Sequence, residues 1–145
     1  MTPLKRLKYL SRQTRPMTRA EIDEIVATAR QCNAERAITG ALVATGNVFF
    51  QILEGPADAV DLVFAKIRAD VRHADVICLA EQLECEGRLF PLWRMERVAL
   101  EGTPASAAIE EKLRELARSD GAARYDLTRE LSRMIAAEAA QSRAA

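Results

Sequence analysis

The sequence has few of the residue types that bind metal ions or cross-link a chain. Its 145 residues include one histidine, His73, and three cysteines, Cys32, Cys78 and Cys85. An odd number of cysteines cannot pair completely, and no two of these have the Cys-x-x-Cys spacing of a redox or metal motif. A metal site needs a cluster of ligands, which one histidine does not provide. We therefore expect no metal site, and thiols that stay reduced in a reducing compartment.

The sequence also lacks an excess of charge and a long apolar segment. Lysine plus arginine and aspartate plus glutamate each number 21, so the net charge is zero. A protein that binds nucleic acid non-specifically would carry a basic excess. No apolar run approaches the roughly 18 residues of a membrane span, and the N-terminus has no apolar stretch of a signal peptide. We expect a cytoplasmic protein with no nucleic-acid or membrane partner.

What the sequence does contain is an apolar hairpin that carries one amide. Between residues 38 and 56, two apolar runs flank Gly46-Asn47, a dipeptide typical of a tight β-turn. In the second run Phe49, Gln51 and Leu53 share one strand face, and Val48, Phe50 and Ile52 share the other. Both faces are apolar, which is typical of a buried strand. An unpaired amide there would cost about 1–3 kcal/mol, so Gln51 is predicted to have a specific partner.

Apolar periodicity and turn signals predict alternating strands and helices around this hairpin. They are a strand at 4–11, a helix at 18–33 that begins with a Thr18–Glu21 capping box, a helix that begins at Gly55-Pro56, a strand at 76–80 and a strand at 88–98. This order predicts an α+β fold with a ferredoxin-like βαββαββ sheet, and right-handed crossovers place both helices on one face. We expect the first and third strands to be parallel neighbours at the centre of the sheet.

Beyond residue 100 the pattern becomes helical. One amphipathic helix is predicted to begin at Thr103-Pro104 and a second at about Asp126, with a break at 119–122 and a frayed tail at 141–145. The predicted division is therefore a core at 1–100 and a helical extension at 101–145. We expect the two helices to cover the apolar strand face opposite Gln51, in the same chain or in a partner subunit.

In this fold several polar side chains converge on one groove between the sheet and the first two helices. Strand pairing places Tyr9 beside Gln51, and helical spacing puts Asn33 on the buried stripe of the first helix. Ile25 and Ile67 are expected on the walls, Arg72 and His73 at the mouth, and Trp93 and Met95 share one face of the fifth strand. Such a set suits a flat aromatic ligand with a hydrogen-bonding edge, because an amide both donates and accepts.

Six motifs carry a resemblance to a known family. They are Arg-Leu-Lys-Tyr-Leu-Ser at 6–11, Ala-Arg-Gln-Cys-Asn at 29–33, Ile-Thr-Gly-Ala-Leu at 38–42, Phe-Gln-Ile-Leu-Glu-Gly-Pro at 50–56, Asp-Val-Arg-His at 70–73 and Arg-Leu-Phe-Pro-Leu-Trp-Arg-Met at 88–95. Over residues 4–98 the sequence resembles a BLUF domain, a blue-light sensor that uses flavin.

The resemblance implies a role for each matching residue. Tyr9 would donate an electron and a proton to excited flavin, and Gln51 would be the switch amide between Tyr9 and the ring. Asn33 would hold the polar edge of the ring, Ile25 and Ile67 would pack on it, and Arg72 and His73 would flank it. Trp93 and Met95 would report the switch to the surface. The implied cofactor is FAD bound non-covalently, with FMN or riboflavin as substitutes.

Three residues depart from the family pattern. Lys8 precedes the tyrosine where aliphatic residues are usual, and it should face away from the flavin. Arg94 stands between Trp93 and Met95 where a small polar residue is common, and Lys66 stands where an arginine can reach the flavin phosphates.

The sequence leaves other functions open. The first hypothesis is a photoreceptor without catalytic activity, which signals through an unidentified downstream protein or through a light-dependent homo-oligomer. The second is a light-insensitive interaction module on the same fold. The third, an acylphosphatase-like enzyme, has the least support because the sequence contains no phosphate cradle and no nucleophile–base pair.

Overall fold

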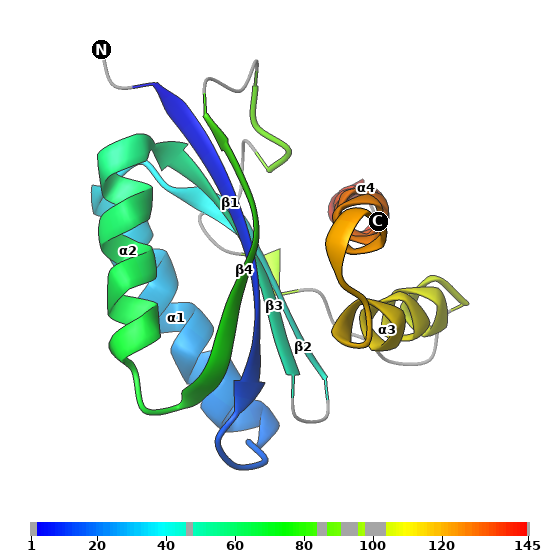
Figure 1. Ribbon diagram of the computed structural model, residues 1–145. Helices are drawn as coiled ribbons and strands as arrows, with labels where there is room; N and C mark the ends of the chain where they lie inside the picture. The colour runs from blue at the N-terminus through cyan, green and yellow to red at the C-terminus, as the bar shows by residue number, and fades with distance from the viewer. Residues whose placement is uncertain (1–2, 46–47, 84–86, 91–95, 98–103, 145) are drawn as a thin grey trace.

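The protein is built in three layers around one β-sheet (Figure 1). The computed structural model describes residues 3–45, 48–83, 87–90, 96–97 and 104–144. Helices α1 (Arg19–Glu35) and α2 (Ala57–Ala69) lie on one side of the sheet, which we call the inner face. Helices α3 (Pro104–Ala117) and α4 (Gly121–Ala144) lie on the opposite, outer face. The fold is α+β and ferredoxin-like, as the sequence predicts.

The sheet has five strands in the order β4-β1-β3-β2-β5. They are β1 (Leu4–Gln13), β2 (Thr39–Thr45), β3 (Val48–Pro56), β4 (His73–Leu83) and β5 (Glu96–Arg97). β5 pairs with β2 in parallel, and the other pairs are antiparallel.

The prediction that the first and third strands are parallel is wrong, because β1 and β3 run antiparallel. The crossover through α1 makes β1 parallel to β2, and the hairpin then reverses β3 between them. This orientation puts Tyr9 directly opposite Gln51 in the register. Directly opposed side chains on one sheet face are the closest cross-strand neighbours, so the correction strengthens the predicted pairing.

The inner helices are positioned by their caps and apolar stripes. At the start of α1 the Thr18 side chain accepts from the Glu21 backbone N–H, while the Glu21 carboxylate accepts from the Thr18 backbone N–H. α1 buries Ile22, Val26 and Asn33, which recur at helical spacing. α2 begins directly after Pro56, whose φ of −54° suits the entry to a helix.

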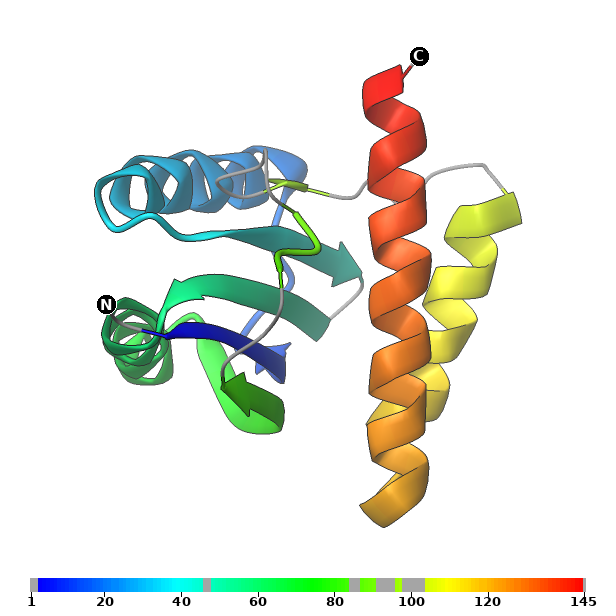
Figure 2. The same ribbon diagram turned by 90° about the horizontal axis from the view of Figure 1, so that it is seen from above.

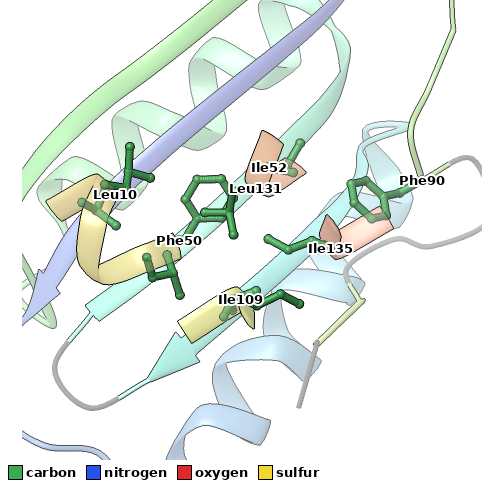
Figure 3. Packing of buried hydrophobic residues seen from close by; sticks show 11 residues of the cluster. Leu10, Phe50, Ile52, Phe90, Ile109, Leu131 and Ile135 are labelled. Carbon is green, nitrogen blue, oxygen red and sulfur yellow. The ribbon is translucent and has the colours of Figure 1, made fainter. Parts of the chain in front are cut away.

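The outer face of the sheet is covered by the two C-terminal helices of the same chain (Figures 1 and 2). Phe50 and Ile52 of β3 pack with Ile109 of α3 and with Leu131 and Ile135 of α4 (Figure 3). The alternating faces of β3 were thus predicted correctly: Phe49 and Leu53 belong to a separate cluster on the inner face. The predicted domain boundary at residue 100 falls among residues 98–103, outside the described part of the chain.

Several elements are longer or shorter than predicted. β4 begins at His73 instead of residue 76, because α2 ends at Ala69 and a turn closed by the His73 N–H on the Asp70 carbonyl leads directly into the strand. α4 begins at Gly121 instead of Asp126 and continues through the predicted tail to Ala144. Its start is fixed by Arg124, whose guanidinium donates to the Ser119 carbonyl over 2.6 and 3.0 Å. In the predicted fifth strand only Glu96–Arg97 is described as β5, and Trp93, Arg94 and Met95 lie outside the described residues.

None of the helices in the described ranges is long and apolar enough to cross a membrane.

Candidate functional site

A cleft with a volume of about 180 Å³ lies between the inner face of the sheet and helices α1 and α2. Both helices and four of the strands contribute side chains to it. The lining residues are Tyr9, Ile25, Thr28, Ala29, Cys32, Asn33, Arg36, Leu42, Phe49, Gln51, Val63, Lys66, Ile67, Asp70, Arg72 and His73. The surface is thus mainly apolar, with a few polar groups set into it, which is the composition of a small-molecule site.

The centre of the cleft is a hydrogen bond between the two middle strands. The Tyr9 hydroxyl donates to Gln51 Oε1, and both side chains are almost completely buried, with exposed fractions of 1% and 5%. The bond follows from the antiparallel register, which sets β1 and β3 side chains opposite each other on the inner face. The partner that the apolar strand predicted for Gln51 is therefore Tyr9.

Burial fixes the protonation state of Tyr9. The hydroxyl has lost its contact with water, and this loss raises the pKa of Tyr9 far above its ordinary value of 10.0, with a further contribution from the negative charge of Asp70. Tyr9 is therefore a neutral phenol at any physiological pH. It can act as a hydrogen-bond donor and as a source of an electron and a proton together.

His73, the first residue of β4, closes one end of the cleft through contacts with β1 and β3. Its Nδ1 lies 2.8 Å from Ser11 Oγ on β1. Its ring centroid is 4.9 Å from that of Phe49 on β3 and 6.1 Å from that of Tyr9. Burial lowers the pKa of His73 below its ordinary value of 6.5, because the loss of water disfavours the charged imidazolium; the nearby carboxylate of Asp70 opposes this shift in part.

This depressed pKa predicts a pH dependence of folding. Below about 6.5 the unfolded chain takes up a proton on His73 that the folded protein resists, so stability is greatest above this pH and falls as the pH decreases. His73 is the single histidine, so its imidazole NMR resonances are assigned without ambiguity. We expect a titration midpoint below 6.5, and less loss of stability at acid pH in a His73→Gln variant. A midpoint at or above 6.5 would contradict this account of the site.

Asn33 brings an amide to the helical side of the cleft. Only 2% of its surface is exposed, although it lies within two residues of the end of α1. Its backbone carbonyl accepts from the Arg36 N–H over 3.1 Å and from the Ile38 N–H over 3.0 Å, which ends the helix and starts the chain toward β2. This backbone arrangement holds the Asn33 side chain in the cleft.

Positive charge collects where the cleft opens to solvent. Arg36 follows α1, Lys66 lies in the last turn of α2, and Arg72 precedes β4. The Arg72 guanidinium donates to Asp70 from Nε over 3.0 Å, and this hydrogen bond lowers the pKa of Asp70 to about 2. Arg72 is thereby held at the opening, while Lys66 and Arg36 add cations from the two helices.

The structure brings all eight predicted cofactor contacts into this one cleft. They are Tyr9, Ile25, Asn33, Gln51, Lys66, Ile67, Arg72 and His73. The predicted switch residues Trp93 and Met95 lie outside the described residues. The described residues contain no group of three or more His, Cys, Asp or Glu side chains placed to hold a metal ion.

Sequence reasoning missed several residues of the cleft. Thr28 lies one helical turn before Cys32, the residue next to Asn33, so its place beside the buried stripe could have indicated it. Arg36 has no such signal, because it lies just beyond the end of α1. The contact of Ser11 with His73 depends on the early start of β4, which the periodicity did not show.

Comparison with known proteins identifies the family. The profile described as "Sensors of blue-light using FAD", or BLUF, matches residues 4–96. The chain belongs to the BLUF family of flavin-binding blue-light sensors.

Curated relatives share the sequence of this chain over a small part of their own length. The photoactivated adenylate cyclase subunit beta of Euglena gracilis is 36% identical over 119 residues, which are 81% of this chain and 14% of the relative. Subunit alpha from the same organism is 36% identical over 120 residues, or 81% of this chain and 12% of the relative. The chain thus spans a small fraction of these larger proteins.

The similar solved structures include one chain of about the same length as this protein and one that is much longer. The dark-state structure of BlrB, a BLUF protein, has a TM-score of 0.74 and 31% identity, and the match covers 94% of this chain and 98% of that one. A bacterial light-regulated adenylyl cyclase has a TM-score of 0.71 and 31% identity, with coverage of 88% of this chain and 39% of that one.

Proposed function

We propose that this protein is a blue-light photoreceptor that binds FAD in the inner cleft and uses Tyr9 and Gln51 as a hydrogen-bond switch. The observation that carries the proposal is the buried Tyr9–Gln51 hydrogen bond at the centre of a cleft with cations at its opening. A flat ring with polar edges would lie against Ile25 and Ile67 and meet the amides of Gln51 and Asn33.

The cations at the opening support a phosphate-bearing flavin. Lys66, Arg36 and Arg72 lie on that side, and Lys and Arg are the side chains that neutralise phosphate. FAD and FMN have such phosphates, whereas riboflavin has none. We therefore propose FAD as the native ligand, and expect riboflavin to bind more weakly because it cannot use these charges.

The photochemistry needs one step from Tyr9. A bound flavin would supply the chromophore for blue light and an acceptor for one electron and one proton. Tyr9 would give up that electron, and its phenolic proton would pass along the hydrogen bond to Gln51 Oε1 while the Gln51 amide nitrogen releases a proton to the ligand. Gln51 then reorients or tautomerises, so that it presents a different donor to the edge of the cleft. The electron and proton later return to Tyr9, so the switch is reversible and there is no catalytic turnover.

Two hydrogen-bond arrangements of similar energy are sufficient for such a switch. β3 is the element that can transmit it, because Gln51 faces the cleft while Phe50 and Ile52 on the same strand pack against α3 and α4. We propose that Trp93, Met95 and the two C-terminal helices pass the change to a downstream protein or to a light-dependent homo-oligomer.

The first test is the absorption spectrum of the protein purified in the dark. We expect a yellow, flavin-loaded protein whose visible band shifts to the red under blue light and returns in the dark, because the hydrogen bonding to the ring changes reversibly. Acid extraction followed by chromatography identifies the bound flavin. A colourless protein that takes up no added FAD would contradict the proposal, and a yellow protein without a shift would favour the light-insensitive interaction module.

A further inference from the structure

A buried carboxylate lies near the end of β3, on the outer face of the sheet. Glu54 has no exposed surface, and strand alternation puts it on the same face as Ile52. Its two carboxylate oxygens accept from Arg6 Nε over 2.8 Å, from the Leu89 N–H over 2.7 Å and from the Phe90 N–H over 2.8 Å. Two of the three donors are thus backbone groups that lie 35 and 36 residues further along the chain.

The segment at 87–90 is held in place by side chains of three strands. These residues belong to no helix or strand, so they are not part of the hydrogen-bond ladder of the sheet. Arg6 of β1 donates to the Gly87 carbonyl over 2.6 Å. Arg88 donates to Thr39 Oγ1 of β2 over 2.9 Å and to the Glu54 carbonyl over 3.2 Å. Arg6, Thr39 and Glu54 are directly opposed in the register, so one row across the sheet binds the whole segment.

Phe90 connects this segment to the C-terminal helices. Its side chain is fully buried in the cluster on the outer face, together with Ile109 of α3 and Ile135 of α4 (Figure 3). The N–H and the ring belong to one residue, so the carboxylate that binds the Phe90 N–H also positions the Phe90 ring. β3 therefore reaches α3 and α4 through Glu54 and Phe90 as well as through its own apolar side chains.

The connection through Glu54 differs in its physical chemistry from the apolar contacts. A buried carboxylate costs free energy, and Glu54 offsets this cost with directional, charge-assisted hydrogen bonds. Apolar side chains can slide past one another when a strand shifts, because the hydrophobic effect has no preferred direction. Hydrogen bonds of 2.7 and 2.8 Å fix the distance between their atoms, so the backbone at 89–90 has to follow a displacement of Glu54.

We propose that Glu54 is a positioning residue that couples the Gln51 switch on the inner face to α3 and α4 on the outer face. Gln51 lies three residues before Glu54 on β3, and each hydrogen-bonds to the residue directly opposite it on β1, Tyr9 or Arg6. When Gln51 changes its hydrogen bonds, β3 shifts against β1 and Glu54 shifts with it. The backbone donors of Glu54 follow, and the Phe90 ring moves against the two helices. This role rests on the proposed light-sensing function, because it needs Gln51 to switch.

Hydrogen–deuterium exchange of the FAD-loaded protein, read by mass spectrometry on peptides of α3 and α4, tests this role. The light-to-dark ratio of exchange rates is measured together with the red shift, and in the unmodified protein we expect illumination to change this ratio in both helices. Glu54→Gln should keep the full red shift, because it leaves the inner cleft intact. It should reduce the light-induced change by about twofold or more, as expected for a residue that carries coupling between two sites. Arg88→Met should reduce it as well, since it removes the hydrogen bonds to Thr39 and to the Glu54 carbonyl.

Two comparisons separate this role from a loss of stability. Glu111→Gln makes the same chemical change on the exposed side of α3, and it should keep both the red shift and the exchange response. Arg88→Met leaves the Glu54 carboxylate with its three donors, so it tests the connection without leaving a buried charge unpaired. A protein that is only less stable exchanges faster by the same factor in the dark and in the light, which leaves the ratio unchanged.

The outcomes distinguish the role of Glu54 from light sensing itself. A normal red shift with an unchanged exchange response in both Glu54→Gln and Arg88→Met would overturn the role and leave light sensing in place. If Glu54→Gln does not fold, Arg88→Met decides alone. Loss of the red shift in flavin-loaded Glu54→Gln would also overturn the role, because Glu54 would then act on the inner cleft.

Two further results would count against the coupling. A reduced response in Glu111→Gln equal to that in Glu54→Gln would show that overall charge is responsible. A red shift without any exchange response in α3 and α4 of the unmodified protein would show that the helices do not receive the signal. Absence of the red shift from the unmodified protein would instead contradict the proposed function, and the role of Glu54 with it.

Discussion

Replacement of Tyr9 by phenylalanine should leave the protein yellow and abolish the light-induced red shift. Phenylalanine keeps the ring, which packs on Phe64 at a centroid distance of 5.5 Å, so the cleft keeps its shape. It removes the hydroxyl that donates to Gln51 and with it the proposed source of the electron and the proton. We expect complete loss of the shift in a light-minus-dark spectrum, together with about 1 kcal/mol of lost stability for one broken hydrogen bond.

The chain provides a matched control for this variant. Tyr125 is the other tyrosine, and it is half-exposed on α4, far from the inner cleft. Tyr125→Phe should therefore keep the full red shift. Gln51→Leu should resemble Tyr9→Phe, because it removes the amide while keeping a buried side chain of similar size. A normal photocycle in Tyr9→Phe would refute the role of Tyr9 as donor.

Replacement of Glu54 by glutamine should destabilise the protein by about 3 kcal/mol, within the range for breaking a buried ion pair. The carboxylate is fully buried and accepts from three donors: Arg6 Nε over 2.8 Å, the Leu89 N–H over 2.7 Å and the Phe90 N–H over 2.8 Å. A glutamine amide has only one oxygen, and its NH2 group cannot accept a hydrogen bond. The variant therefore cannot accept from all three donors as the two carboxylate oxygens do. Chemical denaturation in the dark measures the loss.

Glu111→Gln is the control for this variant. Glu111 pairs with Arg114 on the exposed side of α3, where ion pairs contribute at most about 1 kcal/mol. We therefore expect little change in its free energy of unfolding. If Glu54→Gln were no less stable than Glu111→Gln, the hydrogen bonds from Glu54 to Arg6 and to the backbone of residues 89–90 would not stabilise the fold as described.

Local signals in the sequence were sufficient to predict most of the fold. The Thr18–Glu21 capping box placed the start of α1, and the strict alternation in β3 separated Gln51 from Phe50 correctly. The paired faces of β1 and β3 also followed from alternation alone. The relative direction of the strands could not be predicted in this way. Periodicity determines which face a side chain occupies, but it does not show whether neighbouring strands are parallel or antiparallel.

The remaining errors concern contacts between residues far apart in the chain. His73 looked like the end of a helix, and it is the first residue of β4, where Ser11 stabilises it from another strand. Glu54 drew no prediction, because its three donors come from β1 and from residues 89–90. The start of α4 depends on Arg124 folding back to Ser119, which apolar periodicity does not reveal.

The alternation of β3 also limits how this protein can tolerate changes of length. Its odd-numbered residues from 49 to 53 lie on the inner face of the sheet, and Phe50 and Ile52 pack on α3 and α4. Inserting one residue before Gln51 would move the amide into the apolar core and push Phe50 toward the Tyr9 hydroxyl. Inserting two would restore the faces and shift the register with β1 by two positions, which separates Gln51 from Tyr9. Only the present length of the strand therefore keeps Gln51 opposite Tyr9 on one face and the surface that packs on α3 and α4 on the other.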